Sequence, residues 1–241
     1  MDHGFITNPA TSVAVPSRRS FMKTSAALTV GGASAAMFLG SRSLHAVPLT
    51  SAQREENREG VGSGGQRNQF IQIRQHENDH VAFLVKALGS AARPMPNFQG
   101  LLQKKFANFA MVSQTLENTG VGAYLGAAPA LNNPLYLAAA GSIFAVEARH
   151  SGYLNNLLRD PITANVTDDD ANPSFEGPLT AAQVVAGASA FIADLNGGPP
   201  LTYSTTRSDA NDIDVLNFAL ALEYLEAEFY NLNVPHFYRG A

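Results

Sequence analysis

The sequence predicts an all-α protein built on an antiparallel four-helix bundle. Four stretches carry apolar residues at helical spacing, and no run alternates apolar and polar residues convincingly enough to predict a sheet. Two of the four stretches place a glutamate three residues before a histidine, and the other two place a glutamate seven residues before a tyrosine. A four-helix bundle that binds two metals needs one glutamate from each of two helices and Glu-x-x-His from each of the other two.

Residues 1–46 are expected to form a twin-arginine signal peptide, because Arg18 and Arg19 precede a weakly apolar stretch at 26–39. That stretch is too short and too rich in small residues for a good membrane span, so no integral span is expected after cleavage. The expected localisation is periplasmic or secreted. Residues 47–65 are polar and glycine-rich, which predicts a flexible linker before a bundle domain that continues to the C-terminus at residue 241.

The composition excludes several classes of binding partner and of metal ligand. The chain has a net charge of −4, and the part after the basic signal peptide is more acidic still, so nucleic acid is not an expected partner. Cysteine is absent, which excludes disulfides, a thiolate nucleophile and thiolate metal ligands. Any bound metal must therefore be held by oxygen atoms and imidazole nitrogen atoms.

The first bundle helix is expected over residues 66–88 and ends at Gly89. Its Glu77 and His80 are separated by three residues, which on a helix means about 60° around the axis and about 4.5 Å along it. Both side chains can therefore reach one site. They lie in an apolar stretch, where a carboxylate or an imidazole needs a compensating partner such as a metal.

The next two bundle helices are expected over residues 98–127 and 135–159, separated by a short proline-containing turn. A tyrosine seven residues after a glutamate lies two turns along the same helix face. The glutamates fall far enough from the expected helix ends to meet at one height of the bundle. The paired residues are Glu117 and Tyr124 on the second helix, and Glu147 and His150 on the third.

Residues 160–211 are predicted to be an insert containing one short extra helix, which starts with a capping box at Thr180–Gln183 and continues to about residue 195. The last bundle helix is expected over residues 211–232, with acidic residues in its first turn. It carries Glu223 and Tyr230. The helix with a lone glutamate therefore lies at the C-terminal end of the bundle.

The combined pattern resembles the ferritin-like di-iron carboxylate proteins, and more closely an exported bacterial branch of ferritin-like domain proteins. The resemblance rests on both Glu-x-x-His pairs, on Asn118–Tyr124 and on Leu216–Glu226. It implies two iron ions as the cofactor, with manganese as the alternative, and Tyr124 and Tyr230 close to the metals. It also implies that Glu77 and Glu147, with these two tyrosines, are the catalytic residues. The metal ligands it implies are Glu77, His80, Glu117, Glu147, His150 and Glu223.

The helix order departs from that family. Its usual order begins with the lone-glutamate helix, which is last in this chain, so the sequence reads as a circular permutation of the bundle. A terminal helix joined by a long connection can be donated to a neighbouring protomer, which would give a homodimer with swapped C-terminal helices.

The expected function is redox chemistry on iron, dioxygen or peroxide, carried out by a ferroxidase, an oxidase or a peroxide-consuming enzyme. Metal ions and small oxidants are its expected partners. A second hypothesis is a structural helical bundle associated with stress or desiccation, a role linked to some relatives of this branch. The sequence does not decide whether Glu226 is an extra metal ligand or an acid beside the ligands. Gly120 and Gly122 are unfavourable in a helix, so close helix approach or space beside the metals is the expected reason.

A third reading is a zinc metalloprotease, because His76-Glu77-x-x-His80 has the spacing of two zinc ligands and a general base. Such an enzyme needs a third ligand and usually a sheet edge to hold a peptide, and no sheet is predicted. It would also leave the remaining glutamates and His150 buried without a role.

Overall fold

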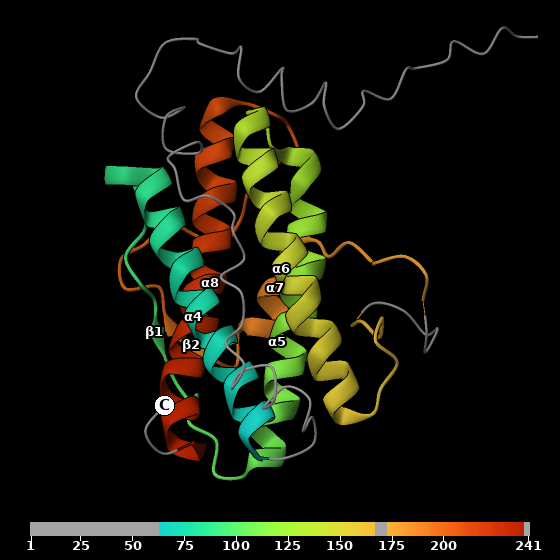
Figure 1. Cartoon of the computed structure of the whole chain (residues 1–241). Coiled ribbons are helices and arrows are strands. Elements are labelled where there is room, and N and C mark those ends of the chain that lie inside the picture. Colours follow the sequence, from blue (N-terminus) through green and yellow to red (C-terminus); the bar gives the residue numbers. More distant parts are fainter. Residues whose placement is uncertain (1–62, 167–172, 239–241) are drawn as a thin grey trace, which may run out of the picture. The chain divides into compact units, whose positions relative to one another are not determined.

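The structure is a computed structural model that describes residues 63–166 and 173–238. The expected signal peptide and most of the expected linker lie outside these residues. Four long helices form a bundle, which confirms the all-α fold class (Figure 1). They are α4 (Ser63–Leu88), α5 (Phe106–Ala127), α6 (Pro134–Leu158) and α8 (Asp209–Phe237). No helix in the described part of the chain is long and apolar enough to cross a membrane.

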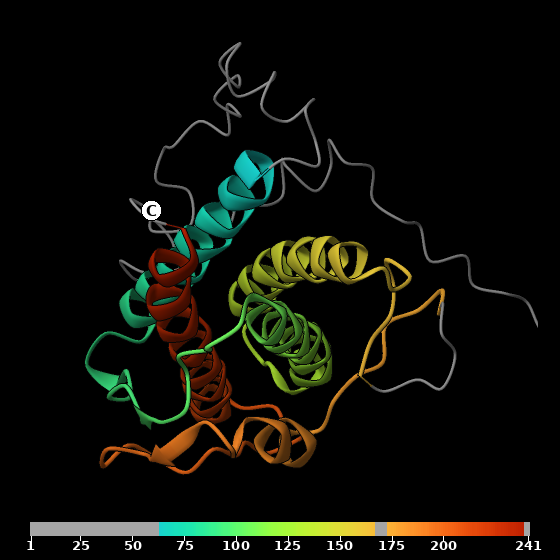
Figure 2. The same cartoon turned by 90° about the horizontal axis from the view of Figure 1, so that it is seen from below.

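The bundle consists of two antiparallel pairs, α4 with α8 and α5 with α6, which meet through α5 and α8 (Figure 2). The connection between α4 and α5 follows the length of α8. Near its start the backbone N–H of Arg93 donates to Asn217 Oδ1 at 2.7 Å, and near its end that of Gln103 donates to Asn233 Oδ1 at 2.8 Å. Because this connection leads the chain back along α8 before α5 begins, α4 and α5 run in the same direction (Figure 1).

Several helix ends differ from the sequence predictions. Helix α5 begins eight residues later than expected, because the chain first forms β1 (Asn97–Phe98), which pairs antiparallel with β2 (Ile192–Asp194). These strands are too short to show an alternating pattern in the sequence. Helix α8 continues beyond residue 232 and includes Pro235 in its last turn. A proline there removes a single intrahelical donor near an end that is already irregular.

The insert covers one side of the bundle, across α5 and α8 (Figure 2). Its helix α7 (Ala181–Ala188) starts with the expected capping box but ends seven residues earlier than predicted. The backbone N–H of Leu179 donates to Gly122 O at 2.9 Å, and a Cβ on Gly122 would lie 2.8 Å from the Leu179 side chain. Gly122 is therefore required by close approach of the insert.

Asp212 fixes the turn between α5 and α6. Its two carboxylate oxygens accept hydrogen bonds from the backbone N–H groups of Asn132, at 2.6 Å, and Asn133, at 2.9 Å. Because the side chain is buried, Asp212→Ala leaves two amide donors unsatisfied and should lower the free energy of unfolding by about 2 kcal/mol. Urea unfolding measures this loss. Asp214→Ala, at an exposed position on the same helix, is the control, and equal losses in both variants would contradict the assignment.

Candidate metal centre

The structure brings the six predicted ligand residues together in the middle of the bundle. Two groups of side chains each place one ligand atom per residue within 4.8 Å of the others. The groups share two carboxylates and come from all four long helices. The first group is Glu77, His80, Glu147 and Glu223, and the second is Glu77, Glu117, Glu147 and His150.

The geometry around His80 fits a metal site. Its Nδ1 lies 3.1 Å from one oxygen of each of three carboxylates. One ring nitrogen carries a single proton or lone pair and cannot bond to three acceptors equally. Neighbouring ligands on an octahedral ion with bonds of about 2.1 Å are about 3.0 Å apart, so one ion can satisfy all four atoms. The three carboxylates are Glu77, Glu147 and Glu223.

A second convergence surrounds His150. Its Nδ1 lies 3.0 Å from Glu77 Oε1 and 3.1 Å from Glu117 Oε2. Glu77 therefore directs Oε1 towards His150 and Oε2 towards His80. Glu147 belongs to both groups as well. These two carboxylates would be shared by a pair of ions, with Glu223 and His80 completing one ligand group and Glu117 and His150 the other.

Burial and charge fit two divalent cations. The four carboxylates are at most 1 % exposed, and Glu147 Oε2 has no hydrogen-bond partner. A buried, unpaired carboxylate is costly unless a cation or a proton compensates it. Four carboxylates and two neutral imidazoles balance the charge of two divalent ions. Oxygen and imidazole ligands suit iron and manganese.

Protonation within this cluster is strongly perturbed. Burial, together with the charge of Glu117, raises the pKa of Glu77 to about 7. Burial and the charges of Glu77 and Glu117 also raise the pKa of Glu147 well above its usual range. Burial opposes charging of His150, but the carboxylates of Glu117 and Glu77 outweigh it and raise the pKa of His150 to about 10. Metal binding at these groups must therefore displace protons.

The two predicted tyrosines pair crosswise between α5 and α8. The hydroxyl of Tyr124 on α5 donates a short hydrogen bond to Glu223 on α8. The hydroxyl of Tyr230 on α8 donates to Glu117 on α5 at 2.7 Å. Each tyrosine thus restrains the glutamate of the opposite helix. Burial raises the pKa of both hydroxyls well above the usual range, so both remain donors.

We expect Tyr230→Phe to weaken metal binding about 10- to 100-fold, because the variant removes the donor that orients Glu117 and keeps the ring in the core. Competition with a chelating dye measures the affinity. Tyr136→Phe, at a half-buried position on α6 outside both ligand groups, should bind as the wild type does. A Tyr230→Phe affinity equal to that of this control would show that the hydrogen bond does not support the site.

His76 lies outside both groups but contacts one of their histidines. Its Nδ1 is 2.9 Å from His150 Nε2, and the two rings are stacked with centroids 5.1 Å apart. The His-Glu-x-x-His spacing suggests His76 as a zinc ligand, whereas in the structure its ring stacks on that of His150 outside both ligand groups. Glu226 also belongs to neither group, although it is only 3 % exposed.

His76→Ala separates the dinuclear site from the zinc-protease reading. Loss of the hydrogen bond to His150 should reduce the affinity of one ion by about 10-fold and leave two ions bound at saturation. Elemental analysis of the reloaded variant counts the ions. A zinc site formed by His76 and His80 would instead lose its metal completely.

A comparison with known families identifies the chain. The ferritin-like domain family matches residues 44–160 and 211–239, which is more than half of the chain and leaves out most of the insert. No curated protein and no solved structure matches the chain. The matched residues include all six residues of the two ligand groups. The chain therefore belongs to the ferritin-like domain family.

Proposed function

We propose that this protein is an exported dinuclear oxidoreductase that acts on iron, dioxygen or peroxide, with two iron ions as its cofactor and manganese as the alternative. The sharing of Glu77 and Glu147 between two ligand groups carries the proposal. Two metals held close together by carboxylates suit redox chemistry, whereas a single structural ion needs no shared ligands. The arginine pair at Arg18 and Arg19 supports export.

When bound, two ferrous ions supply the electrons that reduce dioxygen or peroxide. The protein side chains have separate tasks. Glu77 and Glu147 belong to both ligand groups and would hold both ions. Glu117 and Glu223 are each restrained by a tyrosine hydroxyl, which limits their movement. Burial keeps bulk water away from the reacting centre, which strengthens the electrostatic interactions there.

Helix α8 closes the site within a single chain, because Glu223 joins the group that contains Glu77 and His80. A swapped homodimer would supply the same helix from a neighbour, so the chemistry proposed here is the same in either assembly.

Rapid mixing tests the function. Anaerobic protein loaded with two equivalents of ferrous iron is mixed with air-saturated buffer or with hydrogen peroxide, and iron oxidation and oxygen uptake are followed. We expect oxidation faster than that of free ferrous iron, a loss of this advantage in Glu223→Ala, and wild-type rates in Glu228→Ala, a control on the same helix outside both groups. Equal rates for protein and free iron would contradict the proposal and favour the structural alternative.

A further inference from the structure

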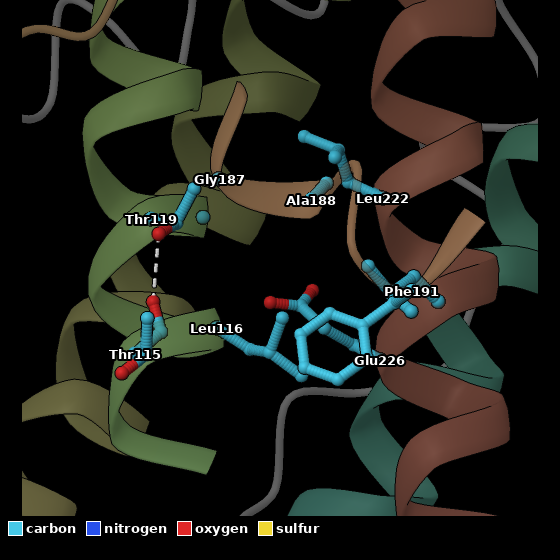
Figure 3. Close-up of a pocket in the computed structure, with 10 residues that line it drawn as sticks. Thr115, Leu116, Thr119, Gly187, Ala188, Phe191, Leu222 and Glu226 are labelled. Carbon is cyan, nitrogen blue, oxygen red and sulfur yellow. Dashed lines mark hydrogen bonds between the residues drawn. The ribbon is translucent and has the colours of Figure 1, made fainter. Parts of the chain in front are cut away.

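A pocket opens between α5, α7 and α8, beside the metal centre (Figure 3). Its cavity volume is about 20 Å³, which is room for a molecule of about the size of water. Thr115 and Gly187 at the mouth are exposed, whereas Gly120 and Glu226 are buried. The pocket therefore leads from the surface towards the interior of the bundle, under the cover that the insert provides.

The walls of this pocket are mainly apolar, formed by side chains that include Leu116, Phe191 and Leu222 (Figure 3). The two threonine hydroxyls bond to their own helix: Thr115 donates to Met111 O at 3.0 Å, and Thr119 donates to Thr115 O at 2.7 Å. Such walls favour small neutral molecules over ions, because moving a charge into apolar surroundings is costly.

Glu226 is the exception among these lining residues. Its carboxyl group points into the pocket (Figure 3), and none of the hydrogen bonds among the described residues involves it. The Glu226 oxygens do not belong to the fully buried side-chain atoms without a partner, so they remain accessible from the pocket and can bond to a small molecule there. Glu226 can bond to water or to peroxide in the pocket.

Gly120 lies between the pocket and the metal centre. A Cβ at this position would be 3.2 Å from Glu147 Oε2 and 3.4 Å from Glu226 Oε1. Glu147 Oε2 is one of three buried carboxylate oxygens in the described part of the chain that have no hydrogen-bond partner. Glycine inside a helix lowers the free energy of unfolding by about 1 kcal/mol relative to alanine. The chain therefore has a destabilising residue at the position where a side chain would separate the pocket from Glu147.

We propose that this pocket is the port through which a neutral molecule of the size of dioxygen or hydrogen peroxide reaches the metal centre. Gly120 forms its inner opening, and Glu226 is its polar contact. The port rests on the proposed function, because it supplies the oxidant.

Nitric oxide binding tests the port without turnover. This neutral diatomic binds ferrous iron, and stopped-flow absorbance gives its association rate with the iron-loaded full chain. We expect Gly120→Ala to slow association by about tenfold, equivalent to about 1.4 kcal/mol of added barrier. Gly141→Ala makes the same substitution at an exposed position on α6 where a Cβ meets nothing within 4 Å, so it should leave the rate unchanged.

Gly187→Leu tests the port at its mouth, away from the ligands. A Cβ on Gly187 meets nothing within 4 Å, so the larger side chain can enter the pocket without disturbing the fold. It should slow nitric oxide association while metal content and helicity stay at wild-type values. It should also remove the xenon that we expect in the pocket of pressurised crystals of the metal-free wild-type chain.

Two results would overturn the port. One is an unchanged association rate in metal-loaded Gly187→Leu, which decides the matter if Gly120→Ala fails to hold metal. The other is the absence of xenon from the wild-type pocket. A chain that passes both tests but oxidises iron no faster than buffer would refute the proposed function and leave the port standing.

Discussion

Glu147→Gln should abolish dinuclear metal binding and at the same time stabilise the metal-free chain. Glu147 belongs to both ligand groups, so an amide in its place would remove one anionic ligand from each. We expect the affinity for both ions to fall by more than about 100-fold, beyond the usual cost of losing a supporting hydrogen bond. Without metal, the wild-type carboxylate is buried among other carboxylates, and its neutral isostere removes that repulsion.

Thermal unfolding with and without a chelator measures both halves of this prediction. At pH 8 the metal-free variant should be more stable than the metal-free wild type by about 1 kcal/mol or more. Added ferrous iron should stabilise the wild type and leave the variant unchanged. Glu228→Gln, at a half-buried position outside both groups, should behave as the wild type does in every condition. Metal-dependent stabilisation that survives in Glu147→Gln would contradict the assignment.

The metal-free chain should lose stability as the pH rises from about 5 to 9. Glu77 has a folded pKa of about 7 against an ordinary value of 4.5, so the folded state holds more protons and this stabilisation is lost as the pH rises between these values. This loss is on the order of 3 kcal/mol. The pKa of His150 is raised from 6.5 to about 10, so its contribution is present below pH 6.5 and is lost as the pH rises through 10.

Glu117 affects stability at lower pH than Glu77 and His150 do. His150 overcomes the effect of burial and lowers the pKa of Glu117, so its contribution is present above pH 4.5 and is lost only in stronger acid. In the metal-loaded chain the ions replace the protons, and stability should instead be maintained or should increase over the same range. Urea unfolding at several pH values, with chelator and with metal, compares the two forms. Parallel pH profiles would show that these groups do not hold the ions.

The sequence was sufficient to predict that the four glutamates meet at one height of the bundle, because each lies at a similar distance from an expected end of its helix. It could not assign the tyrosines to their partners. Tyr230 is two turns from Glu223 on the same helix, and at about 1.5 Å per residue the two are too far apart to bond. Its bond to Glu117 depends on the register between α5 and α8, which local spacing does not determine.

The structure of the insert was also only partly predictable from the sequence. Its capping box was predictable because Thr180 and Gln183 interact locally. The docking of the insert on α5 depends on long-range contacts. Glycine is needed at two positions of α5 for different physical reasons, which the sequence alone does not distinguish. Gly122 admits the side chain of Leu179, whereas Gly120 leaves space beside Glu147. The pocket next to Glu226 becomes recognisable only when α7 is in place.

Anomalous diffraction from crystals of protein purified without added metal tests the dinuclear site most directly. Data collected at the iron and manganese absorption edges identify and locate each ion. We expect two ions about 3.5–4 Å apart, bridged by Glu77 and Glu147, with His80 beside one and His150 beside the other. A single zinc ion between His76 and His80, or no ion among these side chains, would contradict the dinuclear site.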